Sequence, residues 1–246
     1  MSLAVNKNLG DSDDFALVEG CEGGDLLVCK HEVTQEEFEL IMKNNPSDNS
    51  EGRKGHYPVE CVNWYDAIEY CNRRSISEGM KPCYSLYEKT DCSLWGEKDE
   101  AWEKVKCDFN TDGYRLPTME EWWYFARGGN KSKGYKYPGS DDINVVSWNY
   151  YNSNYSTHAV MQKIPNELGI YDLHGNVSEW CWEEEWGLGP EHVVIGGSFG
   201  SWGYSETSKD FKDFLNDIGY DEAMAGMPSS SRCYWCGFRV VRSYTK

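Results

Sequence analysis

The apolar residues of this chain come in short runs, and turn-forming residues interrupt them throughout. Gly, Asn, Ser and Asp separate the runs, and no internal repeat or Pro/Ser-rich linker divides the 246 residues. Long regular elements are not expected from such a chain, because each would need a continuous periodic pattern of buried side chains. We therefore predict a loop-rich α+β fold. It has a flexible N-terminus at 1–13 and one domain at 14–246, with function carried on loops.

Three segments carry the start signals of a helix. Thr34, Asn63 and Thr118 are each followed, three residues on, by a Glu or Asp that can complete a capping box. Apolar residues at helical spacing follow each cap, which predicts a helix after each one. Short apolar runs bounded by turn residues predict strands. These runs are 16–18, 25–29, 193–195 and 238–241.

The charge of the chain excludes two classes of partner. Its formal net charge is −17, whereas binding to nucleic acid or to anionic lipid needs a basic surface. No apolar run approaches the roughly 18 residues of a membrane span. Residues 1–14 lack the pattern of a signal peptide. We expect a native export or lipid-anchor signal to be missing here, and an extracytoplasmic or cell-surface location.

The chain contains ten cysteines, which allow two interpretations. Many cysteines in a chain of this size favour an oxidising compartment and at least one disulfide. Cysteine is also a small buried hydrophobe, and all ten can serve as core residues. Both interpretations stay open at the level of sequence.

Six phrases, in order along nearly the whole chain, resemble the formylglycine-generating-enzyme family, also called sulfatase-modifying factors. This resemblance implies an irregular C-type-lectin-like fold. It does not by itself imply an enzyme, since function depends on the site. The phrases occupy residues 31–38, 58–67, 113–118, 167–180, 196–198 and 237–240.

The resemblance places the catalytic centre of the family at two positions that lack cysteine here. Oxidase members hold copper through two cysteines after the Gly-Gly-Ser phrase, and the matching residues are Ser201 and Glu206. Neither offers the thiolate that copper(I) prefers, so we expect no oxidase chemistry there. Cys233 and Cys236 are either a displaced redox or metal pair, or a disulfide, or two separate contact residues.

The resemblance also implies a calcium site. Family enzymes bind calcium through side chains at the positions of Asp172 and Glu179 and through carbonyls at the positions of Gly175 and Val177. Two carboxylates with carbonyl oxygens suit a hard cation. The alternative is a turn in which both carboxylates accept hydrogen bonds from backbone amides.

The C-terminal segment resembles a second group with this fold, the variable proteins of diversity-generating retroelements. In that group a tail ending in Gly-Phe-Arg-Val-Val is rewritten by adenine-directed mutagenesis and forms a binding face. We expect the corresponding region here at about 197–242. The predicted contact residues are Ser201, Trp202, Tyr204, Ser205, Phe211, Ser230, Ser231, Cys233, Tyr234, Trp235 and Cys236.

Residue usage in this tail gives an independent hint. Asn is frequent between Asn44 and Asn176, but after Gly197 only Asn216 remains. The tail holds Ser, Tyr, Cys and Phe, which arise from an Asn codon when only adenines change. Tyr and Ser are also favoured in binding paratopes. Chance composition of a loop-rich C-terminus is the alternative, and Trp202 and Trp235 are equally well explained as core residues.

The tail also contains a predicted insertion. The stretch 209–227 has no counterpart in the family phrases, and 210–218 shows the pattern of a short amphipathic helix. We expect this insertion to flank the binding face.

These observations lead to one main hypothesis and two alternatives. The main one is a non-enzymatic protein whose C-terminal face binds a macromolecular ligand, with protein as the first expectation. This protein would require no cofactor, with calcium as an option. It would have no nucleic-acid partner and would contact a membrane only through the missing lipid anchor. The alternatives are a metal-dependent oxidase of the formylglycine-generating kind with an atypical cysteine arrangement, and a calcium-dependent glycan-binding module.

Overall fold

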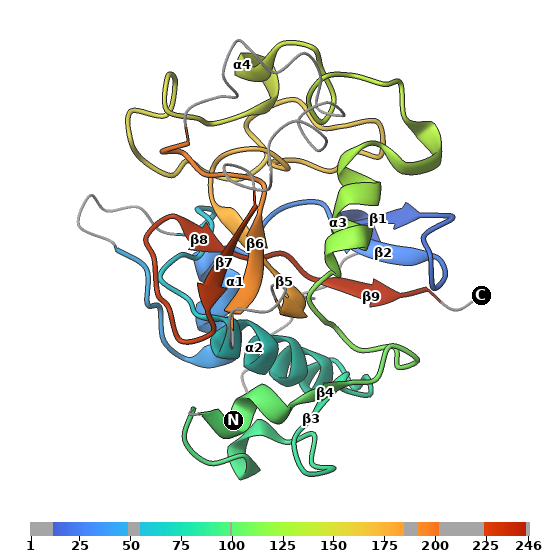
Figure 1. The fold of residues 1–246 in the computed structure, drawn as a ribbon, viewed down its shortest axis with the longest axis vertical. Helices are drawn as coiled ribbons and strands as arrows, with labels where there is room; N and C mark the ends of the chain where they lie inside the picture. The colour runs from blue at the N-terminus through green and yellow to red at the C-terminus, as the bar shows by residue number, and fades with distance from the viewer. Residues whose placement is uncertain (1–11, 49–54, 99, 185–190, 202–223, 245–246) are drawn as a thin grey trace, which may run out of the picture.

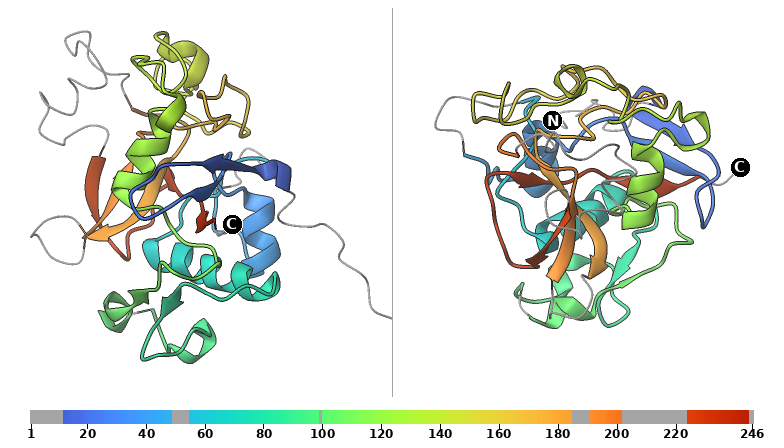
Figure 2. Two further views of the ribbon diagram at one scale, coloured as in Figure 1. Left: turned by 90° about the vertical axis from the view of Figure 1, so that its right-hand side faces the viewer. Right: turned by 45° about the horizontal axis from the view of Figure 1, so that its top comes forward.

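The computed structural model describes residues 12–48, 55–98, 100–184, 191–201 and 224–244. Loops around the short helix α4 (Ile143–Val146) form one end of the molecule (Figure 1). The strand pair β3 (Tyr84–Ser85) and β4 (Lys106–Cys107) lies at the other end. The longer helices and the two larger sheets lie between these ends, and the turned views in Figure 2 show the same order. Nearly all of the predicted flexible N-terminus falls outside the described residues.

The three predicted helices are confirmed at their predicted starts. They are α1 (Gln35–Met42), α2 (Trp64–Ser77) and α3 (Met119–Ala126). In each one the cap side chain accepts from the third helical amide, and the acidic side chain at that position accepts from the cap amide. A cap of this kind stabilises a helix by about 1 kcal/mol. Local sequence therefore fixes where these helices begin.

Two sheets of unequal size organise the middle of the molecule. The first has the antiparallel order β1 (Phe15–Val18), β2 (Leu26–Cys29), β9 (Val241–Ser243). The second has the order β7 (Met224–Pro228), β6 (Glu191–Ile195), β5 (Ser178–Glu184), β8 (Cys236–Gly237). Strand β8 runs parallel to β5, and the other neighbours in this sheet are antiparallel. Short 3-10 helices occupy 12–14, 92–94, 100–104 and 129–131.

The strand predictions succeed in part. Strands β1, β2 and β6 cover the predicted runs, but the fourth run, 238–241, is not one strand. Phe238, Arg239 and Val240 are all buried between β8 and β9. A half-buried strand would alternate sides and place every second residue in solvent. The backbone leaves the strand conformation here and buries three successive side chains, which include a charged one.

The predicted insertion at 209–227 needs a correction at its end. Residues 224–227 belong to β7, which pairs along the whole of β6 from Ile195↔Met224 to Glu191↔Pro228. They are therefore part of the sheet. The predicted helix at 210–218 lies outside the described residues.

Buried tryptophans join helix α2 to strand β5. The indole Nε1 of Trp64 on α2 donates to the Cys181 carbonyl at 3.1 Å, and that of Trp180 on β5 donates to the Val62 carbonyl at 3.0 Å. Both side chains are almost completely buried. Because each indole donor has a partner, a large apolar surface is buried without leaving a polar group unpaired.

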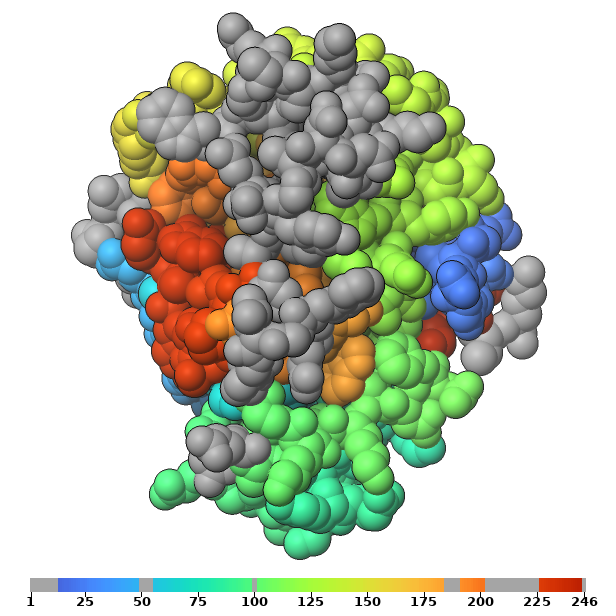
Figure 3. All heavy atoms as spheres, in the orientation of Figure 1, coloured from blue at the N-terminus to red at the C-terminus, as the bar shows by residue number. Residues whose placement is uncertain are grey.

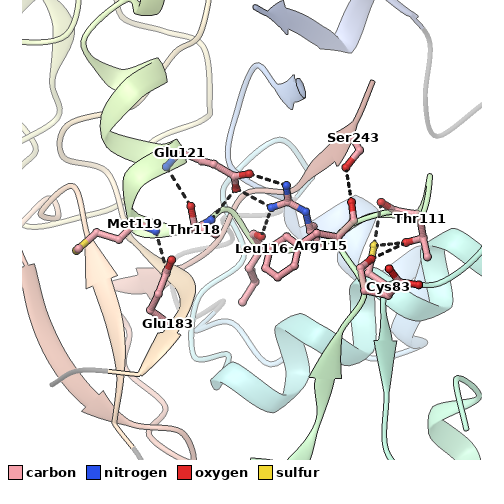
Figure 4. A network of polar contacts seen from close by, with 12 residues as sticks. Cys83, Thr111, Arg115, Leu116, Thr118, Met119, Glu121, Glu183 and Ser243 are labelled. Atoms are coloured by element: carbon pink, nitrogen blue, oxygen red, sulfur yellow. Dashed lines mark hydrogen bonds and ion pairs between the residues drawn. The ribbon is translucent and has the colours of Figure 1, made fainter. Parts of the chain in front are cut away.

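A buried ion pair joins helix α3 to strand β9. The guanidinium of Arg115 donates twice to the Glu121 carboxylate, with both distances 2.6 Å (Figure 4). The Arg115 main chain also exchanges two hydrogen bonds of 2.9 Å with Val241. Glu121 is the residue that completes the cap of α3. The start of this helix is therefore fixed to the last strand through one side chain.

Candidate ligand-binding face

The Gly-Gly-Ser phrase forms a tight turn directly after β6. Gly196 and Gly197 adopt left-handed backbone angles, φ 96° and 68°. The Ser201 hydroxyl accepts from the Ser198 amide at 2.9 Å, and the Ser201 carbonyl accepts from the Tyr150 amide at 3.0 Å. Ser201, where the resemblance predicts a catalytic cysteine in the oxidase members, thus carries a hydroxyl that accepts a hydrogen bond within the turn. Glu206, the second position, lies outside the described residues.

The thiols of Cys233 and Cys236 are not activated. Burial raises the pKa of both, and that of Cys236 most strongly. A thiol must lose its proton to bind metal or to attack a disulfide, and burial disfavours the loss of that proton at both residues. All ten cysteines lie in the described part of the chain, and all ten are free thiols. The disulfide interpretation is therefore not supported.

The described tail residues divide into exposed and packed positions. Ser230 and Tyr234 are exposed, Tyr234 by 62%. Cys233 and Trp235 are half-buried and pack against the core. Cys236 is completely buried, so its side chain is a core residue and not a contact residue as predicted. Ser231 is half-buried, and Trp202, Tyr204, Ser205 and Phe211 lie outside the described residues.

The tail is held to the scaffold through its main chain. Its carbonyls at Ser229, Cys233 and Trp235 accept hydrogen bonds of 2.9–3.1 Å from the amides of Trp64, Cys61 and Ser178. These donors belong to α2, the loop before α2, and β5. Backbone bonds of this kind do not depend on which side chain the tail residue carries. The path of the segment 229–236 is consequently set by the scaffold.

The structure brings the two ends of the predicted face together. The ring of Phe199, two residues before Ser201, lies 6.0 Å from the ring of Tyr234. Figure 3 shows orange atoms of the segment that leads to Ser201 beside red atoms of the tail, along one side of the molecule. Ser201 and Tyr234 therefore border the same surface, although the chain between them is long.

The predicted calcium ligands are used differently. Both Glu179 oxygens are taken by Arg239, whose Nε and Nη2 lie 2.7 and 2.6 Å away, and Glu179 also accepts from the Trp122 indole at 2.7 Å. The Asp172 carboxylate accepts from the Met161 amide at 2.7 Å, as the turn alternative expects of Asp172, whereas the donors to Glu179 are side chains. Gly175 and Val177 lie in the same turn. The guanidinium thus occupies both oxygens of Glu179, whereas Oδ1 of Asp172 is buried without a hydrogen-bond partner among the described residues, and calcium binding at this turn stays a prediction.

Two neighbours of this site escaped the sequence analysis. Glu32 is completely buried, and it accepts from the Asn176 side chain at 2.6 Å and from the Val177 amide at 3.1 Å. Burial raises its pKa well above the usual range, and Asp172 and Glu179 add to the effect. The second neighbour is Arg239, the partner of Glu179, which entered the sequence analysis only as part of the phrase 237–240. Pairing between residues so far apart in sequence leaves no local signal. In the described residues, no group of three or more His, Cys, Asp or Glu side chains is arranged to hold a metal ion.

This arrangement is the C-type-lectin-like fold of the formylglycine-generating type, with few regular elements and a loop-built face. The model of the Sulfatase-modifying factor enzyme 1-like domain matches residues 16–244, and the chain belongs to this family. The fold class and both predicted resemblances are thereby confirmed.

Known proteins that this chain resembles include both variable and inactive ones. It is 38% identical to Chaperone protein LppX of Paenibacillus barcinonensis, over 98% of this chain and 94% of the relative. The solved structure of Treponema denticola variable protein 1 matches with a TM-score of 0.74 and 28% identity, over 93% of this chain and 91% of that one. Inactive C-alpha-formylglycine-generating enzyme 2 of Bos taurus is 31% identical, over 52% of this chain and 33% of its own length. Among the described residues, no helix is both long and apolar enough to cross a membrane.

Proposed function

We propose that this protein is a non-enzymatic binding protein. Its C-terminal region, about 197–242, supplies a face of changeable side chains on a fixed scaffold, and the ligand is a macromolecule, with protein as the first choice. No cofactor takes part in binding. The likeness to a variable protein of Treponema denticola and to an inactive family member supports this proposal.

One observation carries the proposal. The segment 229–236 is fixed by hydrogen bonds from scaffold amides to its carbonyls, while Ser230 and Tyr234 point their side chains into solvent. The Arg232 side chain adds a hydrogen bond to the Cys61 carbonyl at 3.0 Å and an ion pair with Asp66. The segment should still keep its path when Ser230 or Tyr234 changes, because the three carbonyl bonds are made by its main chain. That is the physical requirement for a face whose sequence is rewritten while its scaffold is kept.

Two further observations support the absence of an oxidase activity. Ser201 stands at one catalytic position, and its hydroxyl is used within the turn. The alternative pair, half-buried Cys233 and buried Cys236, has pKa values raised by burial. An atypical copper site at this pair would need thiolates that the environment disfavours.

A substitution series at Tyr234 and Ser230 tests the proposal. We expect Tyr234→Ser, Tyr234→Asn and Ser230→Tyr each to change the free energy of unfolding by about 0.5 kcal/mol or less, as exposed positions do. Phe238→Ala, in the same C-terminal region but completely buried, serves as the control and should cost about 3–5 kcal/mol. Urea unfolding measures both. A loss of stability at Tyr234 as large as that at Phe238 would place it in the core and refute the binding face.

Metal analysis separates the proposal from its alternatives. The purified reduced protein is incubated with excess copper or calcium, dialysed and measured by mass spectrometry. We expect neither metal to be retained. One equivalent of copper that is lost in a Cys233→Ser, Cys236→Ser variant would favour the oxidase. Retained calcium, with chelator-sensitive glycan binding, would favour the glycan-binding module.

We further propose that the protein acts outside the cytoplasm, where a binding face can meet foreign partners. The ten free thiols are compatible with either redox environment, so the cysteines do not decide this point. Surface proteolysis of intact cells that produce the native gene product is the test. Protection from protease until the cells are lysed would contradict this location.

A further inference from the structure

The segment 143–162 carries no Asp, Glu, Lys or Arg, in a chain in which 26% of the residues are charged. It contains instead three tyrosines among Asn and Ser residues, which we call the tyrosine cluster: Tyr150, Tyr151 and Tyr155. Tyr151 is 68% exposed and Tyr155 is 64% exposed. Large exposed aromatic side chains gathered in an uncharged stretch indicate a contact surface.

The side chains of the tyrosine cluster contact one another. The ring of Tyr150 lies 5.4 Å from that of Tyr151 and 4.9 Å from that of Tyr155, and both pairs meet edge to face. The Tyr150 and Tyr155 side chains also share a hydrogen bond, which raises the pKa of Tyr155. Tyr155 adopts a left-handed backbone angle, φ 58°.

The loop that carries the cluster is fastened to the turn at the start of the predicted face. The Tyr150 amide donates to the Ser201 carbonyl, and the Ser153 hydroxyl donates to the Phe199 carbonyl at 2.8 Å. The His158 ring bonds the Ser153 carbonyl at 2.8 Å and stacks on Trp148 at 3.7 Å. In Figure 3 yellow atoms from this part of the chain lie beside the orange atoms that precede Ser201. The cluster and the tail therefore border one surface.

We propose that the tyrosine cluster is a fixed half of the binding face, and that the face takes a protein surface with an uncharged centre and a basic surround. The inference rests on the proposed function, because it assigns scaffold residues to the same face. Tyr, Ser and Asn are the residues by which paratopes bind proteins, since tyrosine offers rigid contact area and the small polar residues offer adaptable hydrogen bonds. The net charge of −17 attracts a basic partner, and the uncharged cluster suits the dry centre of an interface.

The test uses a phage-displayed library of random peptides, selected against the immobilised protein. Selected peptides are synthesised, and their Kd values are measured against the unchanged protein and three variants. The variants are Tyr151→Asn with Tyr155→Asn in the cluster, Tyr234→Ser in the tail, and Tyr87→Asn as control. Tyr87 is 66% exposed with φ 51°, so it matches Tyr155 in exposure and backbone. It lies beside β3 at the opposite end of the molecule (Figure 1).

We expect the selected peptides to be richer in Lys and Arg than the library. The cluster variant should weaken binding by about tenfold or more, as the loss of aromatic anchors does, and the control should change Kd by about twofold at most. Peptides that bind the cluster variant unchanged but lose affinity for Tyr234→Ser would overturn this inference and leave the proposed function standing. Peptides whose Kd changes neither for the cluster variant nor for Tyr234→Ser would overturn both the inference and the proposed function. Failure to enrich peptides, or binding to neutral sugars on a glycan array instead, would also overturn the inference.

Discussion

Arg239 is a buried charged residue that connects separate parts of the interior. It is completely buried, it pairs with both oxygens of Glu179, and it also donates to the carbonyls of Cys29 at 3.2 Å and Tyr171 at 2.9 Å. Its guanidinium thus connects the first sheet, the second sheet and the loop before Asp172. Glu32 and Asp172 lie close enough for its charge to act on their pKa values.

Removing this charge should be far more costly than removing a surface one. Arg239→Met leaves the Glu179 carboxylate buried without a charged partner, with only the Trp122 indole among the described residues still donating to it, and we expect a loss of about 3–5 kcal/mol of unfolding free energy. Arg73→Met removes an i,i+4 pair with Glu69 from a side chain that is 42% exposed, and should cost about 1 kcal/mol or less. Urea unfolding of both variants decides the matter. Equal losses would mean that Glu179 does not need its partner.

Asp172 and His174 give stability two opposing dependences on pH. Burial raises the pKa of Asp172 from 3.8 to about 6, so the folded state binds that proton more tightly and stability falls as pH rises through this window. Burial lowers the pKa of His174 from 6.5 to about 4, so stability falls as pH drops through nearly the same window. The two effects largely cancel in the unchanged protein.

Asp172→Asn should separate these effects. Asn keeps an oxygen for the Met161 amide and tolerates the left-handed angle at this position, φ 54°. Between pH 4 and pH 7 the variant should gain about 2–3 kcal/mol relative to the unchanged protein, which follows from about two pKa units. Thermal or urea unfolding at several pH values measures this gain. Parallel stability curves would show that Asp172 is not the group responsible.

At the scale of elements, local sequence explains where helices start and end. Contacts between residues far apart in sequence explain the other features of the fold. Thr34, Asn63 and Thr118 predicted three helices because a cap and its partner are neighbours in sequence. Strand β8 has two residues and owes its place to β5, from which it is far removed along the chain. The use of Glu179 by Arg239 was likewise outside the reach of local patterns. Both of these depend on contacts that form only in the complete fold.

The turn at Gly175 offers a matched test of such packing. A Cβ at Gly175 would lie 2.1 Å from the Trp148 carbonyl oxygen, whereas a Cβ at Gly169 would meet nothing within 4 Å. The two glycines share almost the same backbone angle, φ 80° and 79°. Gly169→Ala should cost about 1–2 kcal/mol from backbone strain alone. Gly175→Ala should cost about 1–3 kcal/mol more, because the loop before the tyrosine cluster must move. Equal costs, measured by urea unfolding, would mean that this loop yields freely.

At the scale of the whole molecule, the burial of the cysteine thiols indicates how accessible the core is to a reagent in solution. Seven of the ten cysteines are buried, and three, Cys61, Cys107 and Cys233, are half-buried. A thiol reagent at neutral pH should modify at most these three in the native protein and all ten in guanidinium chloride. Raised pKa values at all three half-buried thiols should slow even that reaction. Rapid native labelling of more than three would show that the core opens readily.

The sequence predicted the fold better than the face. The six sequence phrases were enough to predict the fold, because proteins that share a scaffold share its packing residues and the spacing between them. For the face, the tail composition pointed to Tyr234 and Ser230, both of which are exposed, but also to Cys236, which is in the core. The tyrosine cluster was missed because nothing in a run of Asn, Ser and Tyr tells an exposed loop from a contact surface. Its proximity to Ser201 exists only in three dimensions.

The first sheet has a consequence for how the chain is made. Strand β2 pairs with β9, so that Leu26 faces Ser243, and the proposed binding region lies between them in sequence. Strand β1 can pair with β2 early, but the other edge of β2 stays open during synthesis until the last strand leaves the ribosome. The C-terminal region has then already been translated, and a sequence there that blocks the docking of β9 leaves Val28 and its neighbours open to proteases. Under the proposed function, quality control of the cell would in this way remove unsuitable C-terminal sequences before any of them meets a ligand.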